Sequence, residues 1–113
     1  MQEQRSVRTN RWERGVENHK FQEILTVLER CPLCAKIVAF FLRHKAAMDT
    51  ARGIAEWWVQ EDLETTQEAL HRLVACRVVI MRTYSGINLY SFTTDPEIQE
   101  KLEEYFRQKQ ESC

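Results

Sequence analysis

The chain has 113 residues, of which 43% are hydrophobic and 29% are charged, and its formal net charge is −1. This length suits one domain with one modest core, and the balance of apolar and charged residues excludes global disorder. No apolar run approaches the roughly 18–20 residues of a membrane-spanning helix, and the first residues lack the apolar segment of a signal peptide. We therefore expect a cytoplasmic protein without membrane contact, whose four cysteines are thiols.

Residues 1–17 lack the periodicity of a packed element and are predicted to form a flexible basic arm. Arginines recur there at every third position, namely Arg5, Arg8, Arg11 and Arg14, with Trp12 among them. If the segment became helical on binding, these arginines would lie along one face and neutralise phosphates. The alternative is a frayed terminus that only keeps the chain soluble.

Two helices are predicted between Asn18 and Arg43, with a break at Cys31-Pro32. Proline disfavours helical geometry in the residue before it and suits the first turn of a new helix. The first helix is amphipathic, because apolar residues recur at helical spacing: Phe21, Ile24, Leu25 and Leu28. The second is apolar nearly all round, which is typical of the central, most buried helix.

The stretch from Thr50 to Thr93 is the most informative. Thr50 is a suitable N-cap for a helix over 51–59, and Asp62 is a suitable N-cap for a second helix over 62–74. The apolar period then changes from 3.6 to 2, so residues 78–84 and 87–93 are predicted to form a β-hairpin that turns at Ser85-Gly86. The connector at 45–49 has room for a short strand against the hairpin.

The last predicted helix begins at Asp95-Pro96-Glu97, which supplies a cap, a proline at the first position and an acid near the positive helix end. Its apolar stripe contains Ile98, Leu102, Tyr105 and Phe106. The expected fold is therefore mainly α with an α+β character: a winged helix-turn-helix with a β-hairpin wing and flanking helices. We assign residues 18–109 to this single domain and residues 110–113 to a tail.

This order resembles the small winged-helix repressors of bacteria and archaea, in particular the ArsR-like and MarR-like groups, over residues 33–106. The residues that carry the resemblance are Thr50, Ile54-Ala55-Glu56, Leu70-His71-Arg72-Leu73, Val78-Val79 and Tyr90-Ser91-Phe92-Thr93. The resemblance implies a transcriptional regulator that binds double-stranded DNA. It also implies a homodimer built from the first and last helices, with helix 62–74 inserted into the major groove.

The chain departs from the pattern of these repressors where they have glycine. The turn between the two motif helices, residues 58–62, has no glycine and is about one residue longer than usual. At the end of the second motif helix, Arg77 or Cys76 has to adopt a left-handed conformation in place of glycine. The adjacent Trp57 and Trp58 point about 100° apart on a helix, so we expect one in the core and one over its edge.

The residues expected to contact DNA lie on helix 62–74 and on the hairpin: Thr65, Gln67, His71, Arg72, Arg82, Tyr84 and Asn88. Glu64 and Glu68 lie on the same helix and would repel the phosphates of DNA. Glutamate can, however, accept a hydrogen bond from N4 of cytosine. A second hypothesis is therefore a winged-helix interaction module that docks a protein partner through this acidic helix. The hairpin has one turn glycine and is expected to reach only a few ångströms beyond the sheet.

Cys31 and Cys34 flank the start of a helix with the spacing of a redox-active dithiol, and the positive helix end lowers a thiol pKa. A thiol-based sensor is the third hypothesis. The structural alternative is that one cysteine caps or packs while the other is a small buried hydrophobe.

No metal and no cofactor are expected. Structural zinc needs four ligands, usually two close pairs, and Cys31 and Cys34 have no second pair. The three histidines are separated and lack a nearby nucleophile, and no phosphate-binding glycine loop is present. We therefore expect that the protein is not an enzyme.

Overall fold

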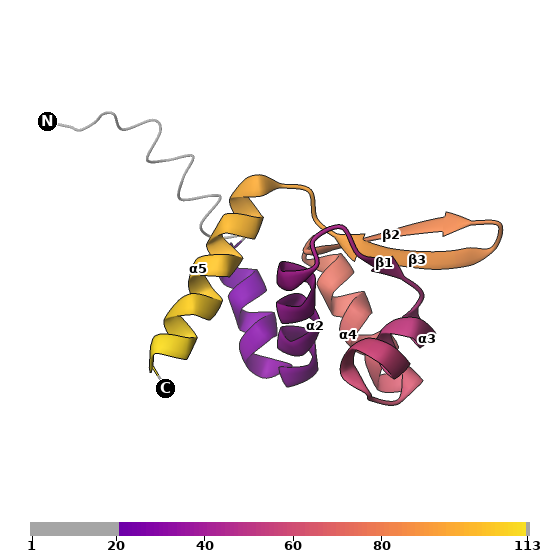
Figure 1. The fold of residues 1–113 in the computed structure, drawn as a ribbon, viewed down its shortest axis with the longest axis horizontal. Coiled ribbons are helices and arrows are strands. Elements are labelled where there is room, and N and C mark those ends of the chain that lie inside the picture. The colour runs from indigo at the N-terminus through magenta and orange to yellow at the C-terminus, as the bar shows by residue number, and fades with distance from the viewer. Residues whose placement is uncertain (1–20, 113) are drawn as a thin grey trace, which may run out of the picture.

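The computed structural model describes residues 21–112, with side chains to residue 109. The predictions for the arm at 1–17 and for a cap at Asn18 lie outside the described residues. The elements follow the predicted order (Figure 1): a helix over 21–30, α2 Pro32–Arg43, β1 Met48–Asp49, α3 Ala51–Gly53, the π-helix η1 Ile54–Val59, α4 Leu63–Ala75, β2 Val79–Tyr84, β3 Ile87–Phe92 and α5 Pro96–Ser112. The predicted fold class, mainly α with a hairpin and flanking helices, is confirmed. Because α5 runs to Ser112, most of the segment assigned to a tail continues this helix; the domain division itself stays a prediction.

The core is built around α2, as its nearly uniform apolar sequence predicts. Cys34, Ile37, Val38 and Phe41 are buried on this helix. The ring of Phe41 stacks on Phe92 of β3 with 5.4 Å between centroids, and meets Trp58 of η1 edge to face at 4.9 Å. One helix therefore contacts both the sheet and the helical segment that precedes α4.

Helix starts follow the capping residues that the sequence offers. The backbone N–H of Gly53 donates to Oγ1 of Thr50 over 3.0 Å, and that of Glu97 donates to Oδ1 of Asp95 over 3.0 Å. Each bond satisfies one of the free N–H groups of a first turn. Gly53 also lies against the carboxylate of Asp49, which a Cβ at this position would overlap. The close approach of β1 and α3 at this corner therefore requires glycine at position 53.

The predicted helix over 51–59 is present, but it is not a regular α-helix throughout. After one α-helical turn it widens into η1, and the carbonyl of Ala55 accepts from both Gln60 and Glu61. A π-turn absorbs an additional residue without breaking the helix, so it accommodates the longer turn. Gln60, in this turn without glycine, then takes a left-handed conformation with φ 58°.

The two tryptophans of η1 have different surroundings. Trp58 packs inward and stacks on Phe40 with 4.2 Å between ring centroids. Trp57 is 78% exposed, so the expectation that the second tryptophan covers the edge of the core is wrong.

The sheet is antiparallel and has the strand order β1-β3-β2. β1 pairs only through Met48↔Ser91 and Asp49↔Tyr90, whereas β2 and β3 pair from Val79↔Phe92 to Tyr84↔Ile87. The predicted turn is confirmed, with φ 51° at Ser85 and φ 79° at Gly86.

The hairpin projects farther than expected. Three strand pairs, from Arg82↔Leu89 to Tyr84↔Ile87, lie beyond the end of β1. At about 3.4 Å per residue, they extend the two-stranded ribbon by about 10 Å before the turn. The expectation that the hairpin reaches only a few ångströms beyond the sheet is wrong. β1 is short and pairs with no residue of the outer hairpin, so three strand pairs extend past its end. We call residues 82–89 the wing; it extends on the side opposite α5 (Figure 1).

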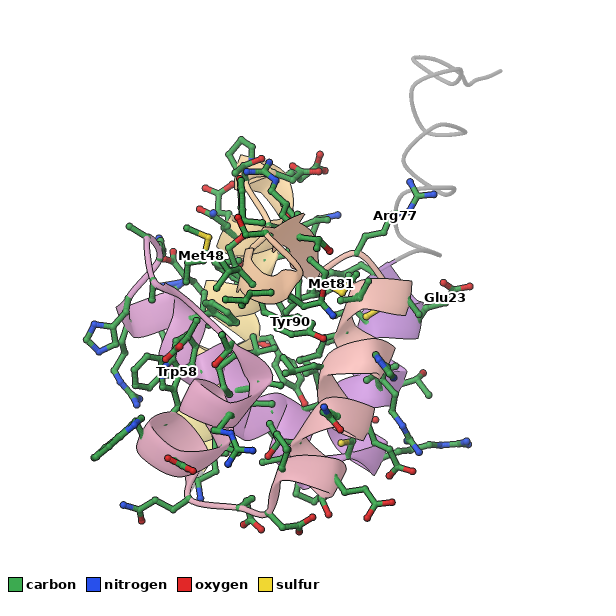
Figure 2. The ribbon with its side chains drawn as sticks, turned by 90° about the vertical axis from the view of Figure 1, so that its right-hand side faces the viewer. Glu23, Met48, Trp58, Arg77, Met81 and Tyr90 are labelled. Atoms are coloured by element: carbon green, nitrogen blue, oxygen red, sulfur yellow. The ribbon has the colours of Figure 1, made fainter. Side chains whose placement is uncertain are left out.

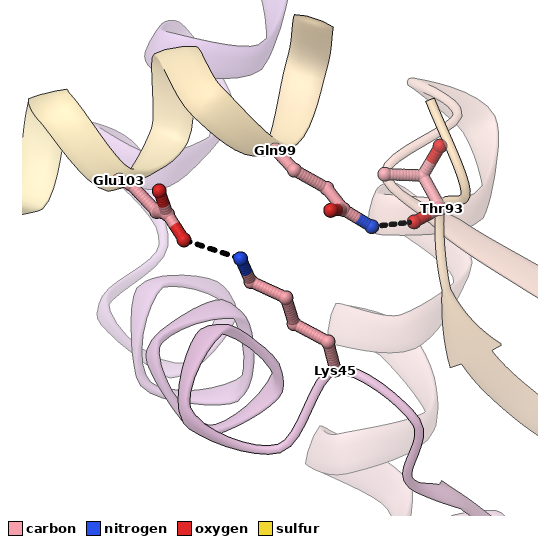
Figure 3. Close-up of polar contacts among 4 residues, drawn as sticks. All are labelled: Lys45, Thr93, Gln99 and Glu103. Carbon is pink, nitrogen blue, oxygen red and sulfur yellow. Dashed lines mark hydrogen bonds and ion pairs between the residues drawn. The ribbon is translucent and has the colours of Figure 1, made fainter. Parts of the chain in front are cut away.

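The last helix is fixed to the body by the fully buried Leu102, by the partly buried Ile98, Tyr105 and Phe106, and by polar contacts. The amide of Gln99 donates to the carbonyl oxygen of Thr93 over 2.6 Å, and Lys45 pairs with Glu103 (Figure 3). Leu102 is therefore part of the core of a single chain, which removes it from the stripe that was expected to form a dimer.

The adjacent tryptophans allow a matched test of this packing. Trp58→Ala removes ring contacts with Phe40 and Phe41, so we expect a loss of about 2–3 kcal/mol in the free energy of unfolding. Trp57→Ala removes an exposed side chain and should change stability by less than about 0.5 kcal/mol. Urea denaturation followed by circular dichroism measures both. Equal losses in the two variants would contradict the arrangement.

Candidate nucleic-acid interface

The N-terminus of α4 is fixed by Asp62, as the sequence predicts. Oδ2 of Asp62 accepts from the backbone N–H of Thr65 over 2.9 Å, and Oδ1 accepts from the Thr65 hydroxyl over 2.7 Å. These hydrogen bonds hold the pKa of Asp62 below its ordinary value. The hydroxyl of Thr65 is thus occupied as a donor, and only its acceptor side is available to a ligand.

One side of α4 faces the core, and its opposite side is exposed. Thr66, Ala69, Leu70 and Leu73 are the buried row. With 100° between successive residues, the side chains opposite this row are Glu64, Glu68 and His71, with Gln67 at one margin. The residues that α4 points farthest from the body are therefore two glutamates and a histidine.

Thr65 and Arg72 lie on another side of α4, toward α2. They line a pocket of about 260 Å³, together with Arg30, Cys31, Pro32, Leu33, Glu68 and Ala69. The structure thus divides the predicted α4 residues between an outward group, Gln67 and His71, and a pocket group, Thr65 and Arg72.

The wing presents its polar residues on both faces. Side chains alternate along a strand, so Arg82 and Tyr84 share one face of the ribbon. Asn88 lies on the other face, where its Oδ1 accepts from the hydroxyl of the cross-strand partner Thr83 over 2.7 Å. All three predicted wing residues are exposed. The structure does not bring them together on one surface.

No family model matches this chain, and no curated protein matches it. Several solved structures do match it. Reduced HlyU from Vibrio cholerae N16961 superposes with a TM-score of 0.64 at 14% identity, covering 84% of this chain and 94% of that one. The homodimeric winged helix-turn-helix DNA-binding domain (fragment 1–100) of Mb0332 from Mycobacterium bovis, a possible ArsR-family transcriptional regulator, superposes with a TM-score of 0.68 at 13% identity. That match covers 98% of this chain and 93% of that one.

The chain has the winged helix-turn-helix fold. In this winged helix, η1 and α4 are the two motif helices, and α4 is the second of them. The predicted replacement of the glycine after α4 is confirmed, since Arg77 adopts φ 69° while Cys76 does not enter the left-handed region. Arg77 is exposed at this end of α4 (Figure 2).

Arg30 was not identified from the sequence as a site residue. It ends the helix over 21–30, which runs antiparallel to α4. Arg30 and Thr65 line one pocket at one end of the pair. At the other end, the charge of Glu23 contributes to the raised pKa of Cys76, and Figure 2 shows Glu23 on the side of the molecule that also carries Arg77. No local pattern contains this pairing, because it depends on how two distant helices pack.

The two cysteines at the start of α2 have different surroundings. Sγ of Cys31 caps the helix by accepting from the backbone N–H of Cys34 over 3.2 Å, and Cys34 is completely buried. One cysteine caps the helix and the other is buried, as expected, and the thiol-based sensor stays a hypothesis. Burial raises the pKa of Cys34, and its hydrogen bond with Cys31 adds to the rise. The expected lowering by the helix N-terminus is therefore wrong for Cys34.

Of the side chains that the structure describes, no three from His, Cys, Asp and Glu gather closely enough to hold a metal ion. None of the described helices is long and apolar enough to cross a membrane.

The cap at Asp62 makes the start of α4 sensitive to acid. Because the folded-state pKa is lowered, the stabilisation is complete above the unfolded-state pKa and is lost as the pH falls through the folded-state value. Asp62→Asn retains a capping oxygen but does not titrate. We expect the stability advantage of the wild type over this variant to shrink as the pH falls from about 6 to about 3. Thermal melting across this range measures the difference, and a constant difference would contradict the assignment.

Proposed function

We propose that this protein is a cytoplasmic DNA-binding transcriptional regulator that acts as a homodimer and inserts α4 into the major groove. The observation that carries the proposal is the joint exposure of α4 and the wing. α4 leaves a complete side uncovered opposite its buried row, and the wing extends about 10 Å beyond β1. A helix of this kind fits the major groove, while a hairpin beside it reaches the backbone or minor groove.

The two groups of side chains take different roles in this complex. Gln67 and His71 face outward from α4 and can donate to base edges, and Glu64 and Glu68 can accept from cytosine N4. Arg72 at the side of α4 and Arg82 on the wing are suited to phosphate. Base reading and phosphate binding are therefore assigned to different parts of the surface.

The homodimer is proposed to form through α5 and the helix over 21–30. Mb0332 is a homodimer of the same fold. In this chain Ile24, Leu28 and Leu102 already lie in the core. Tyr105 and Phe106 are only partly buried and meet edge to face at 5.2 Å, so they offer aromatic surface that a second copy can cover.

The second candidate function is docking of a protein partner on the outward side of α4. The observation that favours it is the acidity of this side, where Glu64 and Glu68 are both exposed. A partner with basic side chains would be attracted to these carboxylates, whereas DNA phosphates would be repelled by them.

Arginine variants test the DNA proposal. Arg72→Ala and Arg82→Ala should each weaken duplex binding and lower the salt slope by roughly one unit, because both arginines are assigned to phosphate. Fluorescence anisotropy over a salt series measures both quantities. The matched control is Arg107→Ala, which removes an exposed arginine from α5. If the wild type does not bind duplex DNA even at low salt, the proposal fails.

Glutamine variants separate the two candidate functions. Glu64→Gln and Glu68→Gln remove exposed charges, so the fold should be unaffected. If DNA is the partner, both should tighten non-specific binding, because repulsion of phosphate is lost. If a basic protein is the partner, the same two changes should weaken its binding. Weaker DNA binding in both variants would instead show that the carboxylates accept hydrogen bonds from bases.

A charged substitution on α5 tests the dimer. Tyr105→Glu places a charge in the partly buried aromatic pair and should shift the protein to a smaller species in sedimentation velocity, with helix content retained. Arg107→Glu, two residues away on the exposed side of α5, is the control and should not change the species. A wild type that sediments as a monomer at micromolar concentration would refute the dimer.

A further inference from the structure

The pocket beside α4 contains a thiol that no other part of the proposed mechanism uses. Cys31 is partly exposed and lines this pocket with Arg72 and Thr65, both of which belong to the candidate DNA interface. Small solutes thus have access to one sulfur at the junction between α2 and α4. The neighbouring sulfur, in Cys34, is fully buried.

The positions of the two cysteines permit a short disulfide. Cys31 is the N-cap residue of α2 and Cys34 is three residues later, in the first helical turn. Sγ of Cys31 already turns back over this turn, because it accepts from the backbone N–H of Cys34 over 3.2 Å. A disulfide spans Cβ atoms about 3.5–4.5 Å apart, which is shorter than the roughly 5–6 Å between residues three apart inside a helix. Cys31 has an extended backbone and lies outside the regular helix, so closing the bond requires its side chain to move toward Cys34 without breaking a helical turn.

Cys34 connects this pair to the helix that would read DNA. Its thiol donates to the carbonyl oxygen of Ala69 over 3.5 Å, and Ala69 belongs to the buried row of α4. A disulfide has no S–H donor, so oxidation would remove this contact.

We propose that Cys31 and Cys34 are a redox-active pair that closes to a disulfide in the presence of hydrogen peroxide and thereby changes the position of α4. In the first step, Sγ of Cys31 attacks one peroxide oxygen, an S–O bond forms, the O–O bond breaks and one water leaves. In the second step, Sγ of Cys34 attacks the sulfenic sulfur, the S–O bond breaks and a second water leaves with the proton of Cys34. The two sulfurs together lose two electrons, which reduce the peroxide.

The order of the two steps follows from the exposure of the two residues. Cys31 meets the oxidant because it faces the pocket, whereas Cys34 is covered and reacts only with a sulfur that is already adjacent. Burial raises the pKa of Cys34, which keeps it protonated until that encounter. The regulatory consequence rests on the proposed function: oxidation should weaken duplex binding by roughly three- to tenfold, as expected when one buried contact of α4 is lost.

The site is tested without reference to DNA. Reduced full-length protein is treated with hydrogen peroxide, the remaining thiols are alkylated, and linkages are assigned by peptide mass mapping. We expect a bond between Cys31 and Cys34 that a phosphine reductant reverses. Cys31→Ser, whose hydroxyl can still cap α2, should abolish this bond and leave Cys34 reduced. Cys34→Ala should leave Cys31 as a sulfenic acid that a dimedone probe labels.

Controls and contradictory outcomes are equally specific. Cys76→Ser removes another partly buried thiol and should leave the bond intact. The proposed pair is wrong if peroxide links Cys76 or Cys113 in preference, or if Cys31→Ser does not protect Cys34. If the bond forms but wild-type DNA affinity does not change, the coupling to α4 is wrong. If reduced protein fails to bind DNA, the proposed function fails, whereas mass mapping still decides the cysteine pair.

Discussion

The ring of Phe41 is shared by three parts of the winged helix. It stacks on Phe92 of β3, meets Trp58 of η1 edge to face and lies on α2 itself. Aromatic pairs of this kind contribute about 0.5–1.5 kcal/mol each beyond the burial of their surface. Because packed interiors do not deform continuously, a shared ring fixes the relative orientation of the elements around it. The orientation of η1 relative to β3 is therefore set by a buried ring on α2.

The sequence predicts those features whose cause lies within a few residues. The caps at Thr50 and Asp62, the turn at Ser85-Gly86 and the left-handed Arg77 each follow from local backbone chemistry. The widening of η1 was not predicted, although the long turn without glycine was its visible sign. The sequence indicates that the turn is one residue longer than usual, but it does not indicate whether the helix or the loop accommodates the additional residue.

The remaining differences come from packing between distant segments. Leu102 lies on the predicted apolar stripe of α5, but a stripe does not say whether its own chain or a second copy covers it. The same holds for α4, where the predicted DNA contacts divide between the outward side and the pocket at Arg30. For the candidate site, residue types and exposure could therefore be predicted, but the grouping of the side chains could not.

The sheet order leaves the outer edge of β2 free among the described strands, and β1 covers only two residues of β3. Beyond Asp49 the ribbon thus carries unpaired backbone groups along both edges, next to the exposed side chains of Tyr84 and Ile87. An uncovered edge with apolar neighbours is a template for strand addition by another molecule. Arg82 and the short length of the ribbon oppose such pairing, because each strand that is added must accommodate a charged side chain beside it. In concentrated solution, self-association through strand pairing would begin at the wing, and conditions that keep Arg82 hydrated would delay it.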